Sequence, residues 1–126
     1  MDIILWAAQV VLALGFIGAG FNHIRGYDPQ TTRPGMAWMG ALDATVLRAI
    51  GILEVLGAIG VILPAVTRIQ PQLTGWAALG LAAVMIGAIV FHARREGERR
   101  NIAFNAILLA LAAFVAYGRL VLLPFA

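Results

Sequence analysis

The residue in this sequence that is best placed to take part in chemistry is Glu54, a single carboxylate inside a long apolar run. At 1.5 Å per residue along a helix axis, it lies about 9 Å beyond Arg48, the nearest charge on its N-terminal side. A carboxylate at that depth in a membrane costs a few kcal/mol, so such residues usually face a cavity or a partner and mark function. Two interpretations follow. Glu54 either serves a ligand, a proton or a reaction, or it is a structural residue, protonated or hydrogen-bonded to Asn105, that locks two helices together.

Further polar residues gather near the ends of the apolar runs that neighbour the Glu54 segment. Imidazole is the side chain that titrates near neutral pH, which suits proton transfer. We therefore predict that Glu54, His92 and Asn105 form an acid/base or proton-relay group. The predicted ligand-binding residues are Asn22, His23, Trp38 and Asn101. The polar residues of the apolar runs share helix faces with small residues, so we expect them to face the interior of a helix bundle.

A metal site is an alternative use of the same side chains. His23, His92 and Glu54 would supply the two histidines and one carboxylate that bind non-haem iron in oxygenases. The spacing along the sequence does not establish that they converge, so our prediction names no metal ligands. The chain has no cysteine, which excludes disulfides, thiolate metal sites and thiol catalysis.

The composition indicates the environment that must position these residues. Of 126 residues, 62% are hydrophobic and 12% are charged, and the mean hydropathy is +0.92. Soluble domains carry about 25% charged residues. A soluble fold of this length could not hide so much apolar surface, so the lipid bilayer must be the solvent. Nucleic-acid binding is a poor interpretation of the nine positive residues, because all are arginines near the ends of apolar runs.

Four stretches are long enough to cross a membrane, which takes about 20 mostly apolar residues. They are Ile3–Ile24, Val46–Val66, Gln72–His92 and Ile102–Leu123. The first lacks the positive N-terminal region of a secretory signal, so we interpret it as a retained helix. The prediction is an all-α fold, a four-helix integral membrane bundle, formed by one domain over residues 1–126.

The arginines predict the orientation in the membrane. Seven of them belong to the first and third connections or their flanks, and two lie at the opposite end. Positive residues concentrate in cytoplasmic loops. We expect a multi-pass protein of a bacterial-type inner membrane, with both Arg-rich loops in the cytoplasm and both termini outside. The histidines, Glu54 and the asparagines then form a polar cup in the cytoplasmic leaflet.

The first connection, residues 25–45, is long for a bundle of this size. Loops of that length often act as lids or binding loops. Its apolar segment, residues 36–39, favours a simpler interpretation as an interfacial anchor with Trp38 at the level of the lipid headgroups. A lid over the mouth of the polar cup is the alternative.

Three tracts resemble the DoxX-like family of small membrane proteins: Gly51–Gly60 with the following Ile62-Leu63-Pro64, Gly87–Arg95, and Asn101–Arg119. The Glu54-bearing tract is the most specific of the three. Many members have lysine where this chain has His23. The founding members resemble the membrane subunit of an archaeal thiosulfate:quinone oxidoreductase. The resemblance implies a four-helix membrane protein associated with quinone or redox assemblies.

Two functions compete on this basis. The first is an accessory subunit of a membrane oxidoreductase, which would hold a quinone near Glu54 and His92 while a partner supplies electrons. The second is a stand-alone enzyme that isomerises, cyclises or opens an epoxide in a lipophilic molecule by acid/base chemistry. The expected partners are the lipid bilayer, a lipophilic molecule or quinone, and an oxidoreductase partner or a second copy of the chain.

Overall fold

The computed structural model describes residues 1–125, and its main elements are four long helices. They are α1 (Asp2–Arg25), α2 (Ala44–Thr67), α3 (Leu73–Ala93) and α4 (Arg99–Tyr117). A 3₁₀ helix, η1 (Pro34–Ala41), lies in the first connection, and a π-helical turn, η2 (Gly118–Leu122), extends α4. All four long helices have the length and apolar character to cross a membrane, with η2 completing the fourth span. The predicted all-α membrane bundle is confirmed.

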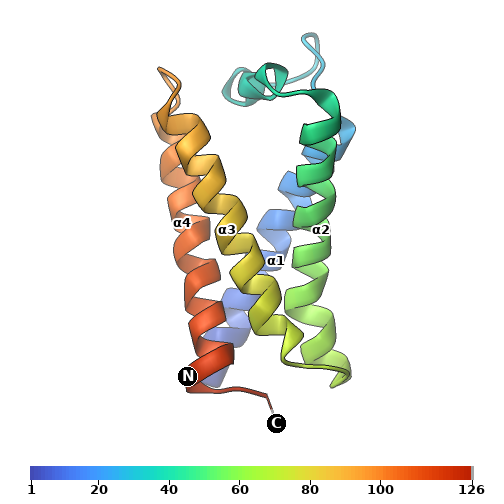
Figure 1. Ribbon diagram of the computed structural model, residues 1–126, viewed down its shortest axis with the longest axis vertical. Helices are drawn as coiled ribbons and strands as arrows, with labels where there is room; N and C mark the ends of the chain where they lie inside the picture. The colour runs from blue at the N-terminus through green and yellow to red at the C-terminus, as the bar shows by residue number, and fades with distance from the viewer. Residues whose placement is uncertain (126) are drawn as a thin grey trace.

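The four helices form two hairpins that pack against each other (Figure 1). The first hairpin consists of α1 and α2, and the second consists of α3 and α4. The N-terminus and η2 lie at one end of the bundle. The first connection with η1 and the α3–α4 connection lie at the other end, called the loop end below. The two Arg-rich connections therefore share one end of the molecule.

Local sequence signals explain where the helices begin and end. The Asp43 carboxylate caps α2 by accepting from the backbone N–H groups of Thr45 and Val46. After α1, Gly26 adopts φ +89°, a backbone conformation that favours glycine. The helix α2 continues through Pro64 to Thr67 and ends at Arg68, which has φ +61°. Pro64 thus lies inside α2, near its C-terminal end.

The middle of the bundle is an apolar core. Leu12 and Phe16 of α1 pack with Val61 of α2, Leu81 of α3 and Val115 of α4, and each is at most 2% exposed. Large apolar side chains also cover the outer faces, where they suit contact with lipid chains. Because lipid is as apolar as these side chains, close packing rather than water exclusion holds such helices together.

Two glycines allow the helices of the first hairpin to touch. A Cβ atom on Gly20 would lie 2.8 Å from the backbone oxygen of Gly51, and one on Gly51 would lie 2.6 Å from that of Gly20. Any larger residue would push α1 and α2 apart. This close approach occurs one helical turn from both His23 and Glu54.

A hydrogen-bonded network joins the helices at the end opposite the loops. The buried Arg119 guanidinium donates to Gln9 at 2.7 Å and to Asp2 at 2.6 Å. Gln9 in turn donates to the backbone oxygen of Val61 at 2.8 Å. These bonds tie α1, α2 and the extension of α4 together, so we assign Gln9 and Arg119 to helix packing.

Candidate functional site

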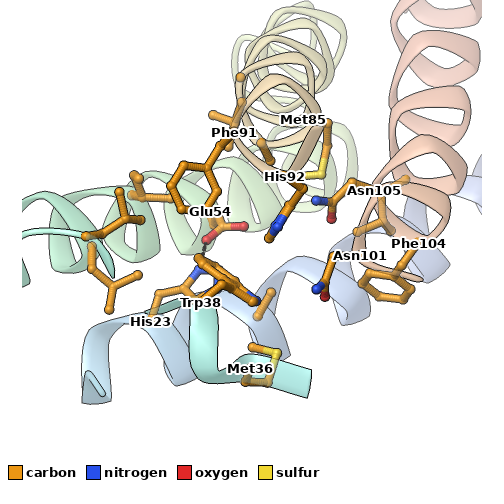
Figure 2. Close-up of a pocket in the computed structure, with 18 residues that line it drawn as sticks. His23, Met36, Trp38, Glu54, Met85, Phe91, His92, Asn101, Phe104 and Asn105 are labelled. Carbon is orange, nitrogen blue, oxygen red and sulfur yellow. Dashed lines mark hydrogen bonds and ion pairs between the residues drawn. The ribbon is translucent and has the colours of Figure 1, made fainter. Parts of the chain in front are cut away.

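A cavity of about 400 Å³ opens between the two hairpins at the loop end of the bundle. All four long helices and η1 contribute to its wall, which is mostly apolar. Polar side chains occupy only a few positions, as Figure 2 shows. They are His23, Trp38, Glu54, His92, Asn101 and Asn105. Six of the seven residues predicted as site residues therefore line one cavity.

Glu54 and His23 form a hydrogen-bonded pair between α2 and α1. His23 Nδ1 contacts Glu54 Oε1, and the two residues are 7% and 1% exposed. Side chains in a helix tilt toward its N-terminus. Since α1 and α2 run in opposite directions, His23 leans toward Glu54 and Glu54 leans toward His23. The glycine contact between the helices brings these two side chains within reach.

The hydrogen-bond partner of Glu54 is His23 rather than Asn105. Within residues 1–125, Glu54 bonds to His23 and makes no hydrogen bond to Asn105. The hydrogen bond to Asn105, one option of the structural interpretation, is therefore not formed. Asn105 and Asn101 instead lie half-buried on the α4 wall of the cavity, across from Glu54.

A second carboxylate–imidazole pair involves His92 and a residue that the sequence did not single out. His92 is 2% exposed, and its Nδ1 lies 2.7 Å from Glu98 Oε1. The other carboxylate oxygen of Glu98 accepts from Arg95 Nε at 2.7 Å. Glu98 belongs to a charged connection and resembles an ordinary solvated residue in sequence. Its position six residues after His92, across the turn that follows α3, was the only available signal.

Glu98 lies outside the membrane-spanning segments, and its environment favours the ionised form. Partial burial would raise the pKa of its carboxyl group, but the hydrogen bonds from His92 and Arg95 and the charge of Arg95 outweigh this effect. The pKa of Glu98 consequently lies below its ordinary value. An ionised carboxylate only accepts hydrogen bonds, so His92 Nδ1 carries the shared hydrogen.

Trp38 closes the loop end of the cavity. Its ring meets the His23 ring edge-on at 5.3 Å between centroids and the His92 ring at 4.9 Å. The indole Nε1 is buried and has no hydrogen-bond partner among residues 1–125. The sequence favoured an interfacial anchor for this segment. The structure places the Trp38 ring against both histidines, so η1 covers the cavity, as the lid interpretation expects.

Asn22 is the predicted site residue that lies apart from the others. It lines a separate hollow of about 160 Å³ together with Arg25, Thr31 and neighbouring loop residues. The expectation that Asn22 faces the cup is wrong. It is adjacent to His23 in sequence, and the helical rotation of about 100° per residue turns it to another face of α1.

In the part of the chain that the structure describes, His23, His92 and Glu54 are not arranged as a metal site. No group of three histidine, aspartate or glutamate side chains there is arranged to hold a metal ion. Each histidine pairs with its own carboxylate, His23 with Glu54 and His92 with Glu98. His92 lines a different wall from the His23–Glu54 pair, so the three side chains do not form one group of ligands.

Comparison with known families matches the chain over residues 7–115 to the model of the DoxX-like family. The chain belongs to the DoxX-like family. The matched segment includes every residue of the cavity wall named above. No curated protein and no solved structure gives a significant match. Membership identifies this DoxX-like chain as a small membrane protein, in agreement with its four apolar helices.

Proposed function

We propose that this DoxX-like protein binds a lipophilic molecule with hydrogen-bonding oxygens, of the quinone class, and exchanges protons with it. The observation that carries this proposal is the Glu54–His23 pair on the wall of an otherwise apolar cavity. A carboxyl group and an imidazole that share a proton can give it to, or take it from, a bound oxygen. Buried ionisable residues of membrane helices commonly serve such relays.

The cavity has the size and lining for a ring headgroup. Ligand pockets typically measure about 300–1,000 Å³ and combine apolar walls with a few polar groups, and this one measures about 400 Å³. The Trp38 indole lines the cavity and its buried N–H has no partner in residues 1–125; in this proposal it donates to a carbonyl oxygen of the ligand. Asn101 and Asn105 offer both donors and acceptors on the opposite wall.

In this proposal, an oxidoreductase partner carries out the electron transfer. The sequence has no recognisable flavin, nicotinamide or iron–sulfur motif and no cysteine. The chain therefore acts as an accessory membrane subunit that holds a quinone and manages its protons, while an oxidoreductase supplies or removes electrons. The cytoplasmic leaflet is the proposed location of the cavity, from the arginine distribution.

A direct test is the binding of a short-chain benzoquinone and its quinol to the purified full-length protein in detergent. We expect saturable binding, with loss of affinity of about tenfold or more in Glu54→Gln and His23→Phe. Trp76→Phe is a control, because Trp76 is 59% exposed on the outer face of α3. Binding that is equal in all four proteins, or absent from the wild type, would contradict the proposal.

A stand-alone acid/base enzyme is the second candidate. Its specific support is that two imidazoles line the cavity, each bonded to a carboxylate: His23 to Glu54, which also lines it, and His92 to Glu98, which lies outside it. Two such groups suit simultaneous proton donation and removal. Incubation of the purified protein with lipophilic epoxides or alkenes, followed by mass spectrometry, separates the two functions. Product formed without any redox partner, and lost in Glu54→Gln, would favour the enzyme.

A further inference from the structure

We propose that Glu98 is a positioning residue that makes His92 the second proton acceptor of the cavity and connects it to water at the loop end. This inference rests on the proposed function for the identity of the ligand. It concerns a pair of residues whose geometry can be tested without a ligand. Glu98 lies at the start of α4, just outside the span, and His92 lies in the last turn of α3.

The geometry assigns the two nitrogens of His92 different tasks. Nδ1 is bonded to Glu98 at 2.7 Å, on the side of the charged connection. No residue among 1–125 forms a hydrogen bond to Nε2, while the ring lines the cavity beside Trp38. An ionised Glu98 holds the hydrogen on Nδ1 and leaves the lone pair of Nε2 for a ligand, because the bond at one nitrogen sets the state of the other.

Proton movement through this ring needs no displacement of the helices. When a ligand hydroxyl meets Nε2, its O–H bond breaks and an N–H bond forms, which leaves an oxyanion and an imidazolium. The Glu98 carboxylate stabilises that imidazolium. The proton on Nδ1 then passes to the Glu98 carboxylate and, from that side chain, which is 14% exposed, to solvent, which leaves a neutral ring with its hydrogen on Nε2. The reverse sequence returns a proton to the ligand.

The charges around the His92–Glu98 pair differ from those around the His23–Glu54 pair, which is called the deeper pair below. Glu98 and Arg95 lie on the loop side of His92, and His23 and Glu54 lie on another part of the cavity wall. On α4, the polar groups that line the cavity are the uncharged amides of Asn101 and Asn105. The Glu54 side chain is 2% exposed, so the deeper pair is shielded from water, whereas Glu98 reaches it.

Nuclear magnetic resonance of histidine side chains tests the inference directly, because the chain contains only two histidines. We expect wild-type His92 to carry its hydrogen on Nδ1 at neutral pH. In Glu98→Gln, the side-chain amide can donate as well as accept, so both tautomers of His92 should be populated. The His23 signals should not change.

Matched variants separate this role from a general disturbance. Glu96→Gln removes an exposed carboxylate of the same connection and should leave both histidines as in the wild type. Glu54→Gln should alter His23 and leave His92 unchanged. Unaltered His92 signals in Glu98→Gln, or equal shifts of both histidines, would overturn the inference.

Ligand binding supplies the second measurement. The pH midpoint for binding of the short-chain quinol should shift in Glu98→Gln and not in Glu96→Gln. If wild-type protein binds no quinol but Glu98→Gln still alters His92 alone, the proposed function fails while the His92–Glu98 pair stands. If quinol binds with the same pH profile in wild type and Glu98→Gln, the proton connection fails while the binding function stands.

Discussion

Gly20 and Gly51 bring the backbones of α1 and α2 so close that neither position has room for a Cβ atom. The Cβ position at Gly51 would lie 2.6 Å from the backbone oxygen of Gly20 and 2.9 Å from the Cβ of His23. The same contact that joins the helices thus sets the distance between His23 and Glu54. Helix packing and the His23–Glu54 pair depend on one pair of glycines.

The first prediction concerns this contact. Gly51→Ala should destabilise the bundle by about 1–3 kcal/mol, the usual cost of forcing extra atoms into a packed interface. The nearest atom to the new Cβ is the backbone oxygen of Gly20, at 2.6 Å, which cannot rotate away. Gly18→Ala is the control, because nothing lies within 4 Å of its Cβ position. Thermal unfolding in detergent measures the difference, and equal melting temperatures for the two variants would refute the role of the contact.

The second prediction separates function from stability at Glu54. Glu54→Gln keeps the shape of the side chain and removes its titration, so binding or activity should be lost without unfolding. Glu54→Leu should be inactive and at least as stable as the wild type, because interhelical hydrogen bonds in membranes average only about 0.6 kcal/mol. Melting temperature is measured beside quinone binding. A structural lock would show the opposite pattern, with function lost only in variants that also melt earlier.

The third prediction concerns the buried Trp38 N–H. Trp38→Phe removes this donor and keeps an aromatic ring against His23 and His92. Stability should stay the same or rise, because a buried donor without a partner costs about 1–3 kcal/mol. Quinone affinity should fall by about threefold to tenfold if the N–H donates to the ligand. An unchanged affinity would show that Trp38 closes the cavity without bonding to its contents.

The fourth prediction follows from the lowered pKa of Glu98. A carboxyl group with a pKa below its unfolded value of 4.5 stabilises the fold above that pH, and the contribution disappears as the pH falls through the folded-state pKa. Wild-type protein should therefore lose stability on acidification from about pH 6 to about pH 3. Glu98→Gln should lose less over the same range, whereas Glu96→Gln should follow the wild type. The same dependence of stability on pH in all three proteins would contradict the stabilising role of ionised Glu98.

The fifth prediction is the orientation in the membrane. The structure places both Arg-rich connections at one end of the bundle. Reporter fusions at either terminus should be active outside the cytoplasm, and an insertion at residues 94–98 should report the cytoplasm. The reverse pattern would show that the cavity lies in the outer leaflet.

The sequence alone determined the four spans and the all-α class, because a run of about 20 apolar residues is a local property. It also drew attention to Glu54 and both histidines, since polar groups in such runs are costly. The partners of these residues depended on the tertiary structure. Whether Glu54 meets His23 or Asn105 depends on the rotation and crossing of helices, which hydropathy does not encode. The pairing of Glu98 with His92 and the position of Trp38 were decided by the paths of two connections, whose sequences suit solvent or headgroups equally well.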